Sequence, residues 1–234
     1  MKTHFQRKEI KYYLSKKQAS VFVNSLGSHL VFDAFWPTGE PYHISSIYYD
    51  TSGYDVIRRS VDKPKHKAKL RIRTYENNTH FLELKQKYRG TVYKKRIQLS
   101  AFELKGFIND YKLPQRSDYK ENVIINDIQT FIDNHAPLLR PVHIEYHRVA
   151  YIYRPQQENV RITIDSKLRV FEKTEKCWVK IIPDDYVLME IKAVGSLPLT
   201  LVKSLSHHQI YQTSFSKYGK YFEKRLEQGA IKYV

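Results

Sequence analysis

Five apolar segments of this chain carry charged side chains at every second position. They span residues 69–73, 81–85, 94–97, 161–165 and 189–192, and eleven charged groups occupy the alternating positions. Successive side chains of a strand point to opposite faces, so each segment offers one apolar face and one charged face. The pattern predicts strands that share a basic wall, and such a wall is suited to hold a polyanion.

Helical periodicity appears between these segments. Ser15 and Ser100 each precede apolar residues at three- and four-residue steps, which predicts two capped helices. Further helices are expected over residues 124–132, 198–205 and 218–226. Extended stretches are expected near residues 5–14, 42–50, 67–75, 79–87, 91–99, 142–153, 159–171, 177–183 and 186–194.

The predicted fold class is α+β, an antiparallel eight-stranded β-barrel with helices packed outside and a charged lumen. The breaks within residues 67–99 are short enough for hairpins, so this region reads as a three-stranded meander. Most barrels fill their interior with apolar side chains. Here the apolar faces would meet the helices, and the charged faces would line a wet tunnel. No repeat or linker marks a boundary, so one domain is expected over residues 1–234.

The composition indicates a folded protein with an anionic partner. Hydrophobic residues make up 41% of the chain and the formal net charge is +16. Such an excess favours nucleic acid, an acidic membrane surface or a phosphorylated small molecule as partner. Cys177 is the single cysteine, which excludes a disulfide framework. The start lacks an apolar signal segment and no run reaches a membrane span, so a cytoplasmic location is expected.

The meander concentrates cations on one face. Arg71, Arg73, Lys85, Lys94 and Arg96 would form a dense grid if the strands align, and such a grid is repulsive unless an anion fills it. Guanidinium groups suit bidentate contacts to phosphate, and ammonium groups act as point charges. The alternative is a solvated basic face that binds nucleic acid.

Carboxylates on the same strands favour a site for a phosphate-bearing anion over a face that binds nucleic acid. Glu83, Asp165 and Glu190 stand an even number of positions from the cations of their own strands, so they lie on the same strand face as those cations. A face that binds nucleic acid gains little from acidic groups in its centre. A metal–triphosphate site needs them, because Mg²⁺ or Mn²⁺ is held by one or two carboxylates and by phosphate oxygens. The simpler interpretation, salt bridges to adjacent cations, stays open for each carboxylate singly. No nucleic-acid partner is expected.

Motifs over nearly the whole chain resemble, in their order, the VTC domain, which is the polyphosphate polymerase domain of the vacuolar transporter chaperone complex. That family belongs to the triphosphate tunnel metalloenzymes, together with the CYTH phosphatases and cyclases. The motifs that carry the resemblance lie at residues 7–14, 46–51, 69–75, 81–85, 94–96, 146–148, 161–165, 189–192 and 214–218.

The resemblance implies a closed tunnel in which the terminal phosphate of ATP passes to a growing polyphosphate chain, with Mn²⁺ or Mg²⁺ as cofactor. The expected partners are ATP or another triphosphate, and polyphosphate. The resemblance and the charge pattern together assign the roles as follows: catalysis to Arg71, Arg73, Lys85 and Lys192, triphosphate or polyphosphate binding to Lys11, Lys94, Arg96, Arg148, Arg161, Ser216 and Lys217, and metal binding to Glu190, with Glu83 and Glu9 as further candidates.

Two departures from the family keep other activities open. The CYTH relatives begin with Glu-x-Glu-x-Lys, whereas Arg7 stands at the first acidic position here. Ser214 stands where the eukaryotic polymerase has another lysine. A tunnel that binds polyphosphate without turnover is therefore one alternative, and a triphosphatase that releases phosphate is another. We expect the bare tunnel domain, without regulatory or membrane segments, working with a separately encoded membrane partner.

Overall fold

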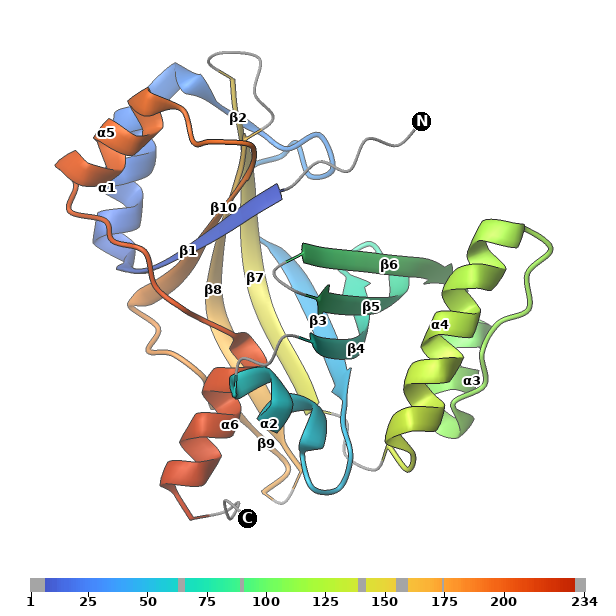
Figure 1. Cartoon of the computed structure of the whole chain (residues 1–234). Coiled ribbons are helices and arrows are strands. Elements are labelled where there is room, and N and C mark those ends of the chain that lie inside the picture. The colour runs from blue at the N-terminus through green and yellow to red at the C-terminus, as the bar shows by residue number, and fades with distance from the viewer. Residues whose placement is uncertain are drawn as a thin grey trace. The chain divides into compact units, whose positions relative to one another are not determined.

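A computed structural model describes residues 7–62, 66–88, 91–138, 142–154, 160–173 and 175–229 (Figure 1). The strands are β1 (Arg7–Ser15), β2 (Leu30–Phe32), β3 (Tyr42–Tyr49), β4 (His66–Tyr75), β5 (His80–Tyr88), β6 (Thr91–Leu99), β7 (Val142–Tyr153), β8 (Val160–Glu172), β9 (Cys177–Lys180) and β10 (Tyr186–Val194). The helices are α1 (Lys16–Leu26), the 3-10 turn η1 (Gly27–His29), α2 (Asp55–Val61), α3 (Ala101–Asp110), α4 (Tyr119–His135), α5 (Leu199–His207) and α6 (Lys217–Glu227).

Every helix and strand predicted within the described residues is present, and the two expected caps are confirmed. Residues 5, 6 and 159 of two predicted strands lie outside the described residues. Ser15 and Ser100 accept hydrogen bonds from the backbone N–H groups of Gln18 and Glu103, which closes a capping box at the start of α1 and of α3. The sequence does not predict η1, β2 or α2. Leu30 continues the apolar periodicity of the first helix in the sequence, but it begins β2.

The first helix ends earlier than the periodicity suggests because of Gly27. Its φ of 49° lies in the region that favours glycine, and its backbone N–H bonds to the Asn24 carbonyl. The chain then turns through η1 into β2. Helix α2 escaped prediction because it has only seven residues and buries just Val56 and Ile57.

The strands form an antiparallel sheet, so the predicted α+β class is confirmed. Eight strands follow the order β1-β10-β8-β7-β3-β4-β5-β6, while β2 pairs with β7 and β9 pairs with β8. Within the described ranges the sheet therefore has ten strands, and β1 and β6 do not pair to close it. The outer edge of β1 bonds to a loop instead, because the Thr213 N–H donates to the Lys11 carbonyl at 2.8 Å.

Contacts divide the chain into two compact units. The first holds the described residues of 1–43, 146–169 and 178–217, and the second those of 44–145, 170–177 and 218–234. Strands β3, β7, β8 and β9 contribute residues to both units. Each unit is made of three separate segments of the chain. The single domain over residues 1–234 that the sequence predicts stays a prediction.

In the first unit the apolar strand faces pack against helices. Ile162 of β8 and Met189 and Ile191 of β10 are buried in one core with Phe22 of α1 and Leu201 of α5. Figure 1 shows α1 and α5 side by side next to these strands. Each side chain of this size contributes about 1.5–3 kcal/mol when fully buried. The apolar halves of the alternating segments thus face the helices, as predicted.

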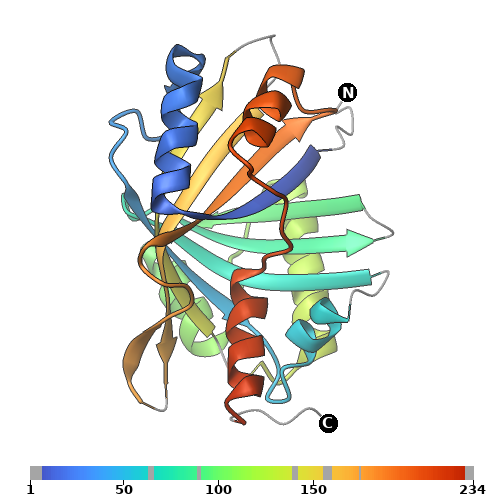
Figure 2. The same ribbon diagram turned by 90° about the vertical axis from the view of Figure 1, so that its left-hand side faces the viewer.

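The second unit repeats this arrangement with other elements. Ile72 of β4, Leu84 of β5 and Ile97 of β6 are buried in one core with Phe107 of α3 and Ile128 of α4. Figure 2 shows β4, β5 and β6 side by side in front of the yellow-green α4. The charged residues that alternate with these apolar ones therefore lie on the face opposite α3 and α4.

A buried carboxylate joins α2 to α6 within the second unit. Asp50 accepts hydrogen bonds from the backbone N–H groups of Thr51, Val56 and Ile57. The Tyr218 hydroxyl donates to the same carboxylate at 2.6 Å. Asp50 thereby caps α2 and fixes the first turn of α6. Within the described ranges, none of the helices combines the length and the hydrophobicity needed to cross a bilayer.

Candidate functional site: cation rows and carboxylates on the strand faces

The first row of the charged face in the second unit consists of lysines. Lys69, Lys85 and Lys94 lie directly opposite one another across β4, β5 and β6. Directly opposed residues on neighbouring strands have Cβ atoms about 5 Å apart, and like charges there destabilise the sheet. The register thus confirms the grid that the sequence predicts, and a row of this kind favours an anionic ligand.

Glu83 is the carboxylate of this face and stands between Arg71 and Arg96 in the next row. It is 1% exposed. Its Oε2 lies 2.8 Å from Arg71 Nε and 4.0 Å from Arg73 Nε, and its Oε1 lies 2.5 Å from Lys94 Nζ. Burial alone would raise the pKa of Glu83, but Arg71, Arg73 and Lys94 hold it well below its ordinary value. We call Glu83, Arg71, Arg73 and Lys94 the Glu83 cluster.

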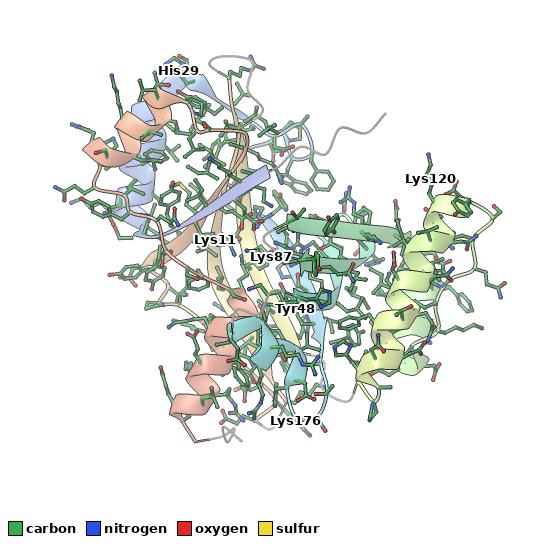
Figure 3. The ribbon with its side chains drawn as sticks, viewed as in Figure 1. Lys11, His29, Tyr48, Lys87, Lys120 and Lys176 are labelled. Carbon is green, nitrogen blue, oxygen red and sulfur yellow. The ribbon has the colours of Figure 1, made fainter. Side chains whose placement is uncertain are left out.

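Tyr48 of β3, labelled in Figure 3, fixes the orientation of Arg71. Arg71 Nη1 donates a hydrogen bond to the Tyr48 hydroxyl at 2.8 Å. The Tyr48 ring packs against Tyr218 with ring centroids 5.5 Å apart. Arg71 is therefore held from two sides, by Tyr48 and by Glu83, before any ligand binds.

Lys94 and Arg96 lie at the β6 edge of this face. The Lys94 side chain is 40% exposed. Burial lowers the pKa of Lys94 to about 8 although Glu83 opposes this shift, and the nearby Arg73 lowers it further. Arg96 stacks its guanidinium over the Phe81 ring at 4.5 Å. Both cations thus stand at the rim, where a ligand can reach them.

In the first unit, Glu190 is surrounded by lysines. Its Oε1 lies 2.8 Å from Lys192 Nζ and its Oε2 lies 3.8 Å from Lys11 Nζ. A side-chain hydrogen bond also joins it to Glu9. Burial alone would raise the pKa of Glu190, but Lys192, this hydrogen bond and Lys11 hold it well below its ordinary value. We call Glu190, Glu9, Lys11 and Lys192 the Glu190 cluster.

Asp165 pairs with two of the predicted phosphate-binding cations. Arg148 donates to both carboxylate oxygens, at 2.6 and 2.8 Å, and Lys217 Nζ lies 2.6 Å from Oδ2. Burial alone would raise the pKa of Asp165, yet Arg148 and Lys217 hold it at about 2. Lys217 also lies over the Tyr146 ring at 4.5 Å. In this trio one carboxylate contacts two cations, so each charge has an oppositely charged neighbour within the chain.

The remaining predicted residues of the first unit also have contacts within the chain. Arg161 Nε lies 2.5 Å from Asp33 Oδ2. Lys11, labelled in Figure 3, donates from Nζ to the Phe215 carbonyl at 2.6 Å and so holds the segment before α6 against β1. Ser216 lies in that segment, directly before the first residue of α6.

The two units differ in their balance of charge. In the first unit each of the named cations stands beside a carboxylate, namely Glu9, Asp33, Asp165 or Glu190. In the second unit, three successive described rows of the β4–β6 face contain one carboxylate, Glu83, and six cations. The cations are Lys69, Arg71, Arg73, Lys85, Lys94 and Arg96. The described rows of the second face therefore have the larger excess of positive charge.

The donor set of the Glu190 cluster fits a hard cation. Glu9 and Glu190 are two carboxylates on neighbouring strands, beside Lys192 and Lys11. Mg²⁺ usually binds through one or two carboxylates completed by phosphate oxygens. Among the described residues no group of three or more acidic, histidine or cysteine side chains has metal-binding geometry. A metal here would therefore need the substrate as a further ligand.

Sequence reasoning overlooked Tyr48 and Asp33 as partners of the site. Tyr48 had a usable signal, because it belongs to the 46–51 motif and stands at the position opposite Arg71. Asp33 had none, since it follows a three-residue strand that was not predicted and lies far from Arg161 in the sequence. Asp165 was noticed as a carboxylate, but its two partners follow only from the fold.

Comparisons with known proteins agree with this geometry. The sequence model of the VTC domain matches residues 6–224, so the chain belongs to the VTC domain family. A proposed adenylate cyclase from Bacillus halodurans has a similar fold, with a TM-score of 0.57 and 15% identity over 90% of this chain and 95% of that one. A search of curated protein sequences found no match.

A second similar structure is that of a proposed adenylyl cyclase from Hippeastrum, described as having a dominant triphosphatase activity. Its TM-score is 0.53 and its identity 17%, over 94% of this chain and 95% of that one. At such low identity the two structures establish the shared fold alone.

Replacing the central carboxylate of the Glu83 cluster tests whether it balances charge. We expect Glu83→Gln to lower the free energy of unfolding by ~3 kcal/mol, because buried cations lose their partner. The same change should strengthen tripolyphosphate binding about tenfold, because one negative charge leaves the site. Thermal unfolding and isothermal titration calorimetry measure the two effects.

Glu103→Gln is the matched control, because Glu103 of α3 pairs with Arg116 in the same unit, and α3 packs on the face of the sheet opposite the charged one. It should leave tripolyphosphate affinity at the wild-type value. If Glu83→Gln instead weakened binding only when Mn²⁺ is present, Glu83 would be a metal ligand and the charge-balancing role would be wrong.

Titration of Lys94 should make tripolyphosphate binding depend on pH. A lysine with a pKa of about 8 is charged at pH 7 and mostly neutral at pH ~9.5. An anion prefers the charged form, so affinity is retained below pH 8 and lost above it. Lys94→Arg stays charged throughout. We expect the ratio of wild-type to variant affinity to fall about tenfold between these pH values. A ratio that does not change with pH would contradict the shifted pKa.

Proposed function

We propose that this VTC domain binds the triphosphate of ATP and transfers its terminal phosphate to a polyphosphate chain, with Mn²⁺ or Mg²⁺ as cofactor. The proposal rests on the three described rows of the β4–β6 face, which hold six cations and one carboxylate. Triphosphates and polyphosphates offer closely spaced negative charges that match such rows.

The Glu83 cluster would neutralise the phosphates. Arg71 is oriented by Tyr48 and Glu83, and a preoriented guanidinium loses little entropy when it binds phosphate. Lys85 and Lys94 add point charges in the adjacent row. Phosphoryl transfer mainly needs positioning and charge neutralisation, so these groups suffice without a side-chain nucleophile.

The Glu190 cluster would hold the metal ion. Glu190 and Glu9 would supply carboxylate oxygens, and a bound divalent ion would offset the charge that develops on the transferred group. Lys192 lies 2.8 Å from Glu190 and can keep that carboxylate ionised. Arg7, which replaces an acidic residue of the CYTH pattern, leaves fewer carboxylates than those relatives have.

A triphosphatase is the second candidate. The structure from Hippeastrum is described with a dominant triphosphatase activity, and its fold resembles this chain over most of its length. Water would then accept the phosphoryl group instead of polyphosphate. Binding of polyphosphate without turnover is the non-enzymatic alternative, favoured by Arg7 and Ser214 at positions where relatives carry other residues.

The partners follow from the same reasoning. We expect ATP or another triphosphate, and polyphosphate, as partners, because compact phosphate chains suit rows of cations that include buried carboxylates. Nucleic acid is not expected, because it gains little from acidic groups within its contact face. A cytoplasmic location and a separately encoded membrane partner remain part of the proposal.

Incubation with ATP and Mn²⁺ tests the proposal through the identity of the products. The wild-type protein should form long-chain polyphosphate, and Arg73→Ala and Glu190→Gln should each lower the rate at least ~100-fold, since each removes charge stabilisation of the transferred group. Gel electrophoresis resolves the polymer, and a colorimetric assay measures orthophosphate. Mn²⁺ omission should abolish turnover.

Lys180→Ala is the control, because Lys180 pairs with Asp184 at an exposed position. It should retain the wild-type rate. Orthophosphate without polymer would select the triphosphatase. Absence of both products, with tripolyphosphate binding retained, would select the non-enzymatic alternative.

A further inference from the structure

The hydroxyl of Ser46 is buried without a hydrogen-bond partner. Ser46 lies on β3 and is 1% exposed, and among the described residues its Oγ has no partner. Its neighbour Ser45 points to the opposite face, where its Oγ lies 2.7 Å from His143 Nε2. Buried hydroxyls are nearly always bonded, so the Ser46 hydroxyl indicates a partner that these residues do not supply.

Ser46 belongs to the charged face of the second unit. It stands directly opposite Arg73 in the pairing of β3 with β4. Directly opposed residues share a face of the sheet, with Cβ atoms about 5 Å apart. Tyr48, two positions further along β3, stands opposite Arg71 on the same face. Ser46 thus extends the row of the charged face that contains Arg73.

The surroundings of Ser46 have many donors and few acceptors. Glu83 is the carboxylate of this face, and its Oε2 accepts from Arg71 at 2.8 Å while its Oε1 lies 2.5 Å from Lys94. Arg73 Nε lies further away, 4.0 Å from Oε2. A ligand for the Ser46 hydroxyl must therefore bring its own acceptor atom, and a negative charge suits the cations of this face. Phosphate oxygens meet both requirements.

We propose that Ser46 is a substrate-binding residue whose hydroxyl donates a hydrogen bond to a phosphate oxygen held beside Arg73. The inference deepens the proposed function and rests on it. The ligand class is the phosphate group of a nucleoside triphosphate or of a linear inorganic polyphosphate.

Two matched serine variants test the proposal. Ser46→Ala should weaken tripolyphosphate binding about tenfold, which is the loss expected for one hydrogen bond to a charged ligand. The melting temperature of unliganded Ser46→Ala should equal or exceed that of the wild type, because the hydroxyl has no partner to lose. Ser45→Ala should bind tripolyphosphate as the wild type does and melt at a lower temperature, because it loses the bond to His143. Calorimetric titration and thermal unfolding give the two readouts.

Either of two results would overturn the inference. One is wild-type affinity in Ser46→Ala. The other is a melting temperature for Ser46→Ala as low as that of Ser45→Ala, since this would mean that the hydroxyl is bonded within the folded chain. If the wild-type protein itself did not bind tripolyphosphate, the proposed function would fail as well. Comparison of the wild type with the variant therefore separates the two failures.

Discussion

The ion pairs of Glu83 are the interaction on which the charged face of the second unit depends. Two unit charges about 5 Å apart repel by ~3 kcal/mol at an effective dielectric constant of about 20, and six cations stand in the three described rows around Glu83. Glu83 reduces that repulsion by contacting Arg71 and Lys94 directly. One carboxylate cannot balance six cations, so the repulsion that remains weakens the empty protein and favours an anionic ligand. The same excess of positive charge thus lowers the stability of the unliganded protein and favours the binding of an anion.

The first unit follows a different principle. Its named cations are paired with carboxylates inside the chain, and the Asp165 trio is so deeply buried that its charges need one another. Several residues with predicted phosphate contacts, such as Arg148 and Lys217, therefore have a structural partner in the absence of ligand. The described face of the second unit, in contrast, has more cations than carboxylates.

Much of the fold could be predicted because its signal is local, whereas the rest depends on contacts between distant residues. Period-two alternation identifies strands, and cap residues such as Ser15 and Ser100 mark helix starts. Strand β2 and helix α2 are too short to show a recognisable period. Arg161 and Asp33 meet only because of the tertiary fold. The orphan hydroxyl of Ser46 becomes apparent only when burial and hydrogen bonds are known together.

Calorimetric titration of the wild-type protein with tripolyphosphate at several salt concentrations, followed by competition with an oligonucleotide, tests whether the charged face binds phosphate chains. We expect saturable binding of tripolyphosphate that weakens as the salt concentration increases. An oligonucleotide at equal phosphate concentration should not displace the bound tripolyphosphate. Absence of saturable binding, or displacement by the oligonucleotide, would show that the face is not a site for phosphate chains.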